Sequence, residues 1–269
     1  MIWICGIILL IVLIWLYLVF PARSSREQRA PFEKRSYAHR GLYEKDQSVP
    51  ENSLPAFRRA VEAGYGAELD IQMTKDGQVV VFHDDTLERA CGRDGQICDF
   101  TFAELQAFPL FGSTERIPLF SGVLEIFSGR QPLIVELKHC PNQKELCAAV
   151  RKMLGAYKGP ACIESFDPRI VRDFRRNDPG RLRGQLANPY SGYRGLMPAY
   201  LGWMLSRVLF NAAARPQFIA FKLAPKPLSV RLCEALGAMK VCWTAREADR
   251  HEQLMQENDA VIFEGYRPS

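Results

Sequence analysis

Short apolar segments of strand length alternate with amphipathic segments along most of this chain of 269 residues. Eight of them have the composition of buried parallel strands: residues 37–40, 68–71, 133–137, 161–165, 182–186, 218–222, 240–244 and 260–263. Helical patterns lie near residues 54–63, 121–127, 144–157, 168–177, 200–213, 228–236 and 247–257. This alternation predicts a (β/α)8 TIM barrel of the α/β class. An open doubly wound sheet is the alternative, but no Gly-x-Gly-x-x-Gly motif follows an early strand.

Polar or ionisable side chains end nearly every predicted strand. They are His39, Arg40, Glu68, Asp70, Glu136, Lys138, Ser165, Lys222, Trp243 and Glu264. The active site of a TIM barrel lies at the carboxyl ends of its strands. We therefore expect these side chains to gather at one mouth of the barrel.

The segment 67–84 predicts a β-hairpin that carries part of this group. Glu68 and Asp70 are two residues apart, so on a strand they share one face. The dipeptide Asp76-Gly77 is typical of a two-residue hairpin turn, which requires positive φ. With these residues at the turn, His83 at the end of the returning strand lies opposite Asp70. The alternative is an ordinary amphipathic hairpin with a polar face.

Three carboxylates on neighbouring strands suit a hard divalent cation, Ca²⁺ or Mg²⁺. They belong to Glu68, Asp70 and Glu136, and no Cys/His cluster has the spacing of a zinc site. The alternative for Glu136 is a salt bridge with Lys138 at the barrel rim.

Two of the four histidines end strands beside these carboxylates, which suggests a general acid and a general base. They are His39 and His83. Arg40 and Lys138 supply cationic donors for a phosphate. A cation site, phosphate-binding donors and paired histidines together indicate chemistry on a phosphodiester. Trp243 is either a wall of the substrate pocket or a core residue.

The first twenty residues contain no charged side chain and are nearly all large and apolar. A helix of that length rises ~30 Å, so we expect residues 1–20 to form a transmembrane anchor. A basic juxtamembrane linker, 21–35, and a catalytic domain, 36–269, follow. The linker carries Arg23, Arg26, Arg29, Lys34 and Arg35. Positive residues favour the cytoplasmic side, which predicts a single-pass membrane protein with its domain facing the cytoplasm.

The remaining composition limits the choice of compartment and partner. Seven cysteines outside the anchor, without metal-type pairing, indicate a reducing compartment. The net charge of +5 lies largely in the linker and does not argue for nucleic acid.

One further segment is unusually apolar for an outer helix of a barrel. Residues 196–214 contain a single charge, Arg207. We expect Leu201, Trp203, Met204 and Leu205 to contact the membrane interface, so that the 196–213 segment is a second membrane contact. The alternative is packing under a neighbouring loop or in a dimer contact.

Several short motifs occur in order along the chain. They are His39-Arg40-Gly41, Pro50-Glu51-Asn52-Ser53, Glu68-Leu69-Asp70, Thr74-Lys75-Asp76-Gly77, His83-Asp84, Glu136-Leu137-Lys138, Ser165-Phe166 and Trp243-Thr244. From about Ser36 to the C-terminus the chain resembles the glycerophosphodiester phosphodiesterase family, which is related in fold to the phosphatidylinositol-specific phospholipases C.

The resemblance implies a TIM barrel that hydrolyses glycerophosphodiesters to glycerol 3-phosphate and an alcohol. It implies that His39 and His83 are the acid/base pair, and that the glycerol hydroxyl acts as an internal nucleophile. A cyclic phosphate would form and water would then open it. The carboxylates of Glu68, Asp70 and Glu136 would hold Ca²⁺ or Mg²⁺. Phosphate and substrate binding is assigned to Arg40, Lys138, Glu51, Asn52 and Trp243.

Two residues depart from the family pattern. Arg246 stands where the family often has Asn, and Glu264 where it often has Asp. We expect neither to contact the metal or the histidines, so that they affect substrate choice only. The chain would act on glycerophosphodiesters, or on lysophospholipids in the manner of a phospholipase D. A catalytically silent binding barrel is disfavoured because every catalytic position of the pattern is filled.

Overall fold

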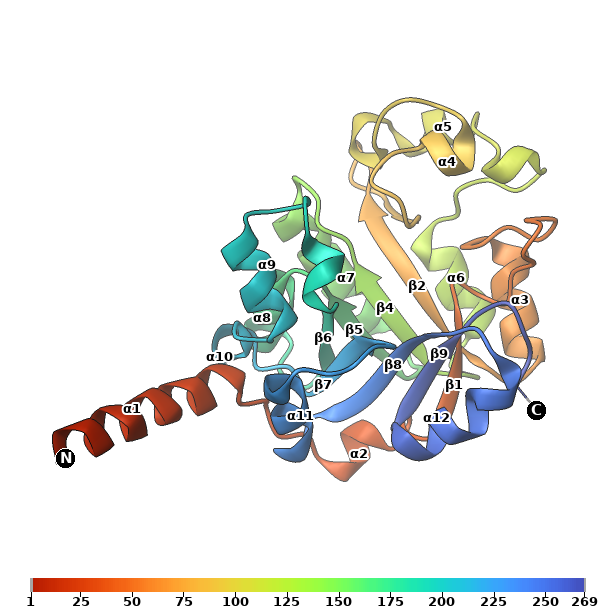
Figure 1. Ribbon diagram of the computed structural model, residues 1–269. Coiled ribbons are helices and arrows are strands. Elements are labelled where there is room, and N and C mark those ends of the chain that lie inside the picture. The colour runs from red at the N-terminus through yellow and green to blue at the C-terminus, as the bar shows by residue number, and fades with distance from the viewer. Residues whose placement is uncertain (1, 269) are drawn as a thin grey trace.

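Eight parallel strands close into a barrel in the computed structural model, which describes residues 2–268 (Figure 1). The barrel strands are β1 (Arg35–His39), β2 (Gly66–Met73), β4 (Leu133–Leu137), β5 (Ala161–Ser165), β6 (Arg183–Ala187), β7 (Phe218–Lys222), β8 (Met239–Ala245) and β9 (Ala260–Phe263). Strand β1 pairs with both β9 and β2, which closes the sheet. The predicted TIM barrel is confirmed, and the open sheet is excluded.

The ninth strand, β3 (Val79–Val81), forms the predicted hairpin with the end of β2. The predicted register is wrong by one residue: Ile71 pairs with Val81, and the Phe82 amide donates to the Asp70 carbonyl (2.9 Å). The turn is longer than two residues, because Thr74 and Gln78 close it through the Thr74 amide and the Gln78 carbonyl (2.9 Å). Gly77 supplies the positive φ (+80°) that this turn needs.

Helices surround the barrel. They are α3 (Leu54–Glu62), α6 (Phe120–Phe127), α7 (Gln143–Ala156), α8 (Pro168–Asn177), α9 (Ala199–Ser206), α10 (Asn211–Ala214), α11 (Leu228–Ala235) and α12 (His251–Glu257). The predicted helix over 200–213 is divided into α9 and α10. The chain turns inward between them, because Val208 is buried against Ile219 and Phe221 of β7. Leu209 is also buried.

Short helical turns complete the chain: α2 (Arg26–Arg29), α4 (Glu88–Cys91), η1 (Ile97–Asp99), α5 (Phe102–Leu105), η2 (Leu110–Gly112), η3 (Tyr190–Tyr193) and η4 (Ala248–Arg250). Four of them, from α4 to η2, form an excursion above β2 and β3 (Figure 1). The excursion has a small core of its own, which includes Leu87, Ile97 and Leu105.

The interior of the barrel is closed by apolar packing. Tyr37, Ile134, Phe218 and Ile262 belong to one buried cluster. The Phe218 ring fills the space beside Gly184, where a Cβ would lie 2.0 Å from a ring carbon. Because this floor is packed, the polar residues near the carboxyl ends of the strands are left facing the mouth.

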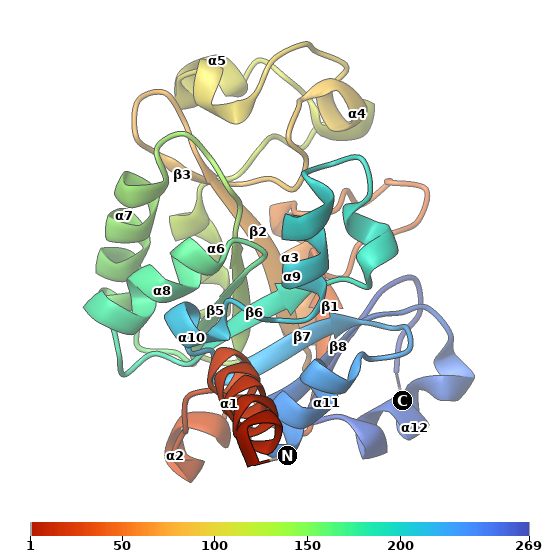
Figure 2. The same cartoon turned by 60° about the vertical axis from the view of Figure 1, so that its left-hand side comes forward.

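Helix α1 (Ile2–Val19) projects from the barrel, and its C-terminal end lies against α10 and α11 (Figures 1 and 2). Arg215 donates to the carbonyls of Tyr17 (3.1 Å) and Phe20 (2.7 Å), and Asn211 donates to that of Val19 (3.1 Å). Within residues 2–268, the structure contains no helix of sufficient length and apolarity to cross a membrane. The predicted anchor over 1–20 is therefore not supported, and the described helix covers Ile2–Val19 of that segment. Met1 of that segment and Ser269 of the predicted domain lie outside the described residues.

Candidate active site

Three carboxylates converge at the mouth of the barrel. One oxygen from each of Glu68, Asp70 and Glu136 lies within 4.8 Å of the others, and all three residues are buried. Glu68 and Asp70 share the inner face of β2, and the β2–β4 register pairs Asp70 with Glu136. The structure thus brings together the three predicted cation ligands.

The electrostatics of this cluster favour a cation. Burial and the charges of Asp70 and Glu136 raise the pKa of Glu68 well above its ordinary value. Burial also raises the pKa of Glu136, although Lys138 opposes this. Burial would raise the pKa of Asp70 too, but His83, Lys138 and Arg40 lower it far below its usual range. Closely spaced carboxylates that destabilise one another fit a hard divalent cation, which prefers oxygen ligands.

Two histidines flank the cluster, and each is held by a carboxylate. His39 Nδ1 hydrogen-bonds Glu264, and His39 Nε2 lies 3.8 Å from Glu68 Oε2. His83 Nδ1 lies 2.6 Å from Asp84 Oδ1. A carboxylate accepts the proton on Nδ1, so the neutral ring keeps Nε2 available as an acceptor. Both histidines line a cavity of about 230 Å³ that also contains Glu68 and Glu136.

The expectation that Arg246 and Glu264 stand apart from the histidines is wrong. Arg246 Nε donates to Glu264 Oε1 (2.6 Å), and the other oxygen of Glu264 bonds His39. Burial would raise the pKa of Glu264, but His39 and Arg246 lower it to about 2. The two departures from the family pattern therefore form one chain of contacts that orients His39.

This contact gives a testable prediction. Glu264→Gln should lower kcat by about 10²-fold, because an amide holds the His39 ring and its tautomer less firmly than a carboxylate does. Glu264→Asp should keep more activity than Glu264→Gln. Steady-state rates and cation affinity measure the effect, and cation affinity should be unchanged. An unaltered kcat in Glu264→Gln would show that the contact is not needed.

The two predicted phosphate-binding cations lie against the carboxylates. Lys138 Nζ lies 3.0 Å from Glu136 Oε1 and 3.5 Å from Asp70 Oδ1. Arg40 Nε lies 3.8 Å from Asp70 Oδ2. Burial lowers the pKa of Lys138, but these two carboxylates more than offset it, so the amine stays charged. The rim salt bridge between Glu136 and Lys138 is thus present together with the acidic cluster.

Glu51 and Asn52 are buried behind this layer. Asn52 Nδ2 donates to Asp70 Oδ2 (3.0 Å), and Arg40 Nη1 donates to Glu51 Oε1 (2.7 Å). Arg89 also donates to Glu51 Oε1 (2.6 Å). These contacts favour a role in holding Asp70 and Arg40 over the predicted contact with substrate.

One wall of the cavity is aromatic. The rings of Phe166 and Trp243 meet edge to face with centroids 5.7 Å apart. Trp243 Nε1 donates to the Ala220 carbonyl (3.1 Å), which fixes the indole in place. Leu186, Asn188 and Ile262 complete this side of the cavity.

Sequence reasoning gave no role to three residues of the site, although one of them, Asp84, belongs to the His83-Asp84 motif. Glu164 is buried in β5, pairs in register with Glu136 and lines the cavity, and its Oε2 has no hydrogen-bond partner in the structure. Burial, followed by the charges of Glu136 and Asp70, raises its pKa well above the ordinary value. The strand alternation that selected Glu68 and Asp70 applies equally to Glu164, one residue before the end of its strand.

The other two, Asp84 and Arg89, connect the histidine segments. Arg89 Nε donates to Asp84 Oδ2 (2.6 Å), and Arg89 also bonds Glu51. A continuous series of ion pairs thus runs from His83 through Asp84, Arg89 and Glu51 to Arg40. No short motif marks Arg89, because it reaches this series from the excursion.

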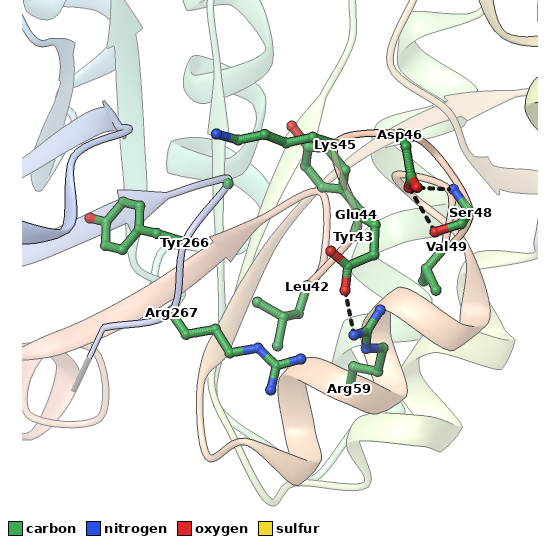
Figure 3. Close-up of a pocket in the computed structure, with 11 residues that line it drawn as sticks. Leu42, Tyr43, Glu44, Lys45, Asp46, Ser48, Val49, Arg59, Tyr266 and Arg267 are labelled. Carbon is green, nitrogen blue, oxygen red and sulfur yellow. Dashed lines mark hydrogen bonds and ion pairs between the residues drawn. The ribbon is translucent and has the colours of Figure 1, made fainter.

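A second hollow, of about 570 Å³, adjoins the site on the loop between β1 and α3 (Figure 3). Arg59 and Glu44 pair there (2.5 Å), and Asp46 accepts from Ser48 (2.7 Å). Tyr43 lines this hollow, and burial, followed by the charges of Glu264 and Glu51, raises its pKa to about 12. The charged groups named here are already paired, so this hollow does not resemble a second reaction centre.

Comparison with known proteins agrees with this geometry. Residues 39–264 match the model of the glycerophosphoryl diester phosphodiesterase family. A glycerophosphodiester phosphodiesterase of Caldanaerobacter subterraneus subsp. tengcongensis is 34% identical over 239 residues, which cover 84% of this chain and 91% of that protein.

Two solved structures share the fold. A glycerophosphodiester phosphodiesterase of Thermotoga maritima has a TM-score of 0.62 at 26% identity, covering 85% of this chain and 93% of that one. An Oleispira antarctica phosphodiesterase in complex with the product sn-glycerol-3-phosphate has a TM-score of 0.69 at 23% identity, covering 85% and 92%. The chain therefore belongs to the glycerophosphoryl diester phosphodiesterase family, and it is a phosphoric diester hydrolase.

Proposed function

We propose that this enzyme cleaves glycerophosphodiesters to glycerol 3-phosphate and an alcohol, with His39 and His83 as the acid/base pair. The observation that carries the proposal is the arrangement of two carboxylate-held histidines around an acidic cluster in one cavity. A silent binding barrel is disfavoured, because it has no need for oriented histidines beside such a cluster.

Glu68, Asp70 and Glu136 would hold the divalent cation, either Ca²⁺ or Mg²⁺. The cation would polarise a phosphoryl oxygen and offset the charge that develops on it. Arg40, which lines the cavity, and Lys138, which stays charged beside the cluster, would add donors for the phosphate. The Phe166–Trp243 wall would exclude water from one side of the diester.

The histidines differ in their surroundings, and this suggests their roles. Burial lowers the pKa of His39 despite the opposing effect of Glu264, so its ring is neutral near pH 7 and suits a general base. His83, more exposed, would then donate the proton to the departing alcohol. His39 would take the proton of the glycerol hydroxyl, whose oxygen forms a bond to phosphorus while the bond between phosphorus and the alcohol oxygen breaks. Water would then open the cyclic phosphate to glycerol 3-phosphate.

The proposal is tested with the full chain and glycerophosphocholine. Excess EDTA should abolish hydrolysis, and adding back Ca²⁺ and Mg²⁺ separately should identify the cation that restores it. Hydrolysis that persists in excess chelator would remove the cation from the proposal.

Lysophospholipids are the second candidate substrates, since they contain the same diester with one acyl chain on the glycerol. The observation that favours them is an apolar groove next to the catalytic cavity.

We also propose that the enzyme works at the cytoplasmic face of a membrane. Support comes from the apolar surface of α1, where Trp3 is 86% exposed, and from the arginines that follow this helix. The part of α1 that projects from the barrel would lie against the lipid (Figure 1). Fractionation should find the full chain with membranes and a chain lacking residues 1–20 in the supernatant. Labelling of the domain by an impermeant reagent in intact cells would contradict the cytoplasmic orientation.

A further inference from the structure

A groove of about 580 Å³ opens beside the catalytic cavity, between α8 and the η3–α9–α10 segment. Its lining is mainly apolar and includes Phe166, Tyr193, Met197, Leu201, Leu205 and Phe210. This volume is typical of pockets that bind small molecules. Figure 2 shows α8, α9 and α10 on the same side of the barrel.

Phe166 joins the groove to the catalytic cavity. Its ring belongs to the lining of both, and it contacts Trp243 on the cavity side. It directly follows Ser165, the last residue of β5. A substrate with its phosphate in the cavity can therefore extend past Phe166 into the groove.

The polar part of the lining lies at the start of α8. Arg169 donates to Asp167 Oδ2 (2.7 Å), and His139 Nδ1 lies 3.1 Å from the same oxygen. The side chains of Arg169 and His139 are 69% and 64% exposed, so these polar groups lie at the solvent edge of the groove. A groove with an apolar floor and a polar edge fits an amphiphilic chain.

The side chains of α9 divide between two faces. Leu201 and Leu205 line the groove, whereas Tyr200 and Trp203 are exposed. This placement does not support the expectation that Leu201 and Leu205 enter a membrane interface. These two leucines offer an apolar surface on which a ligand can be buried within the protein, without insertion of α9 into a membrane.

We propose that this groove binds the acyl chain of a glycerophosphodiester that carries one long chain. The inference rests on the proposed function and names its substrate class. The chain is attached either to the glycerol, as in a lysophospholipid, or to the departing alcohol. Both sources present the same chemistry to the groove, namely an acyl chain that begins near the phosphodiester.

The test uses substrates below their critical micelle concentrations, so that no lipid interface is present. Hexanoyl, octanoyl and decanoyl substrates are compared in two series, one acylated on the glycerol and one on the alcohol. Each fully buried methylene strengthens binding about fourfold, so KM should fall at least about tenfold from hexanoyl to decanoyl in one series. The series that shows this fall identifies the end of the substrate that carries the chain. No dependence on chain length in either series would overturn the proposal.

Variants then show whether the residues of the groove cause the dependence of KM on chain length. Ala213→Trp places an indole in the groove, and Leu205→Ser removes part of its apolar lining; both should abolish most of the chain-length dependence. Tyr200→Ser, on the exposed face of α9, is the matched control and should retain it. The kcat/KM for glycerophosphocholine should stay unchanged in all three, which also shows that they fold. Wild-type chain-length dependence in both groove variants would overturn the proposal.

Calorimetric binding of decanoyl-glycerol 3-phosphate separates this inference from the proposed function. With the chain carried on the glycerol, the wild-type protein should bind it at least about tenfold more tightly than glycerol 3-phosphate, and Ala213→Trp should remove the difference. Such binding without hydrolysis of any diester would refute the proposed function alone. Equal binding of both compounds, together with no chain-length dependence in the series acylated on the alcohol, would refute the groove.

Discussion

Replacing Glu68 by Gln, or Asp70 by Asn, should lower turnover by about 10³-fold, because Lewis-acid stabilisation of a phosphoryl transition state is worth several kcal/mol and about 1.4 kcal/mol corresponds to a tenfold rate. Each variant loses one oxygen of the cluster while the barrel floor stays packed. Rates are measured with saturating Ca²⁺ or Mg²⁺. Full activity in either variant would contradict the cation assignment.

The same two variants should differ in stability without the cation. The raised pKa of Glu68 means that the folded state binds more protons than the unfolded state, so metal-free stability falls as pH rises above the ordinary Glu range. Glu68→Gln removes that loss and should raise Tm at pH 7. The lowered pKa of Asp70 has the opposite sign, because its ionised form stabilises the fold above its ordinary pKa. Asp70→Asn should therefore lower Tm at pH 7.

Thermal unfolding in EDTA checks this contrast. Adding the cation should raise the Tm of the wild-type protein and have little effect on either variant, since ligand binding stabilises only a folded state that binds it. Equal shifts in Tm for both variants in EDTA would show that the electrostatics of the cluster are not as described.

The second large effect concerns the histidines. His39→Ala and His83→Ala should each reduce kcat by ~10²–10⁴-fold, the range for a positioned acid or base. The double variant should lose less than the product of the two, because groups that act on one transition state are not additive. Wild-type kcat in either single variant would show that the residue is structural.

A change of leaving group distinguishes the two roles. A glycerol phosphodiester of p-nitrophenol needs little protonation of its leaving oxygen, so His83→Ala should lose much less activity on it than on glycerophosphocholine. His39→Ala should lose equally on both substrates if it is the base. The reverse pattern would exchange the two roles.

The barrel was predictable because its signal is local and repeated. Buried strands of about five residues, such as β4, β5 and β7, had the predicted bounds, since apolar runs between amphipathic helices leave few other arrangements. The grouping of Glu68, Asp70 and Glu136 followed from the same pattern, because alternate residues of parallel strands face one interior.

The predictions that were wrong or missing concern contacts that a local sequence pattern does not encode. The hairpin register moved by one residue because Thr74, through its backbone and its hydroxyl, closes a longer turn. The contact of Glu264 with His39 joins the first and last strands of the barrel, and only the closed sheet brings them side by side. Arg89 contacts Glu51 from the excursion, and no sequence motif links two residues so far apart in the chain.

The division of α9 from α10 shows the same limit. The composition of 196–213 indicated a helix without a polar face, but Val208, whose φ is +50°, leaves the helical path and packs beside β7. Tertiary packing thus overrides local helix propensity here. The apolar groove is lined from both sides of that division, by Leu201 and Leu205 of α9 and by Phe210 and Ala213, and no periodicity in the sequence predicts it.

The most direct test of the central claim is the identity of the phosphorus-containing product from glycerophosphocholine. Phosphorus NMR of the reaction with the full chain and Ca²⁺ or Mg²⁺ should show glycerol 3-phosphate, with choline released in equal amount. Formation of phosphocholine and glycerol would place the cleavage on the other side of the phosphorus and contradict the account, and so would the absence of hydrolysis with either cation.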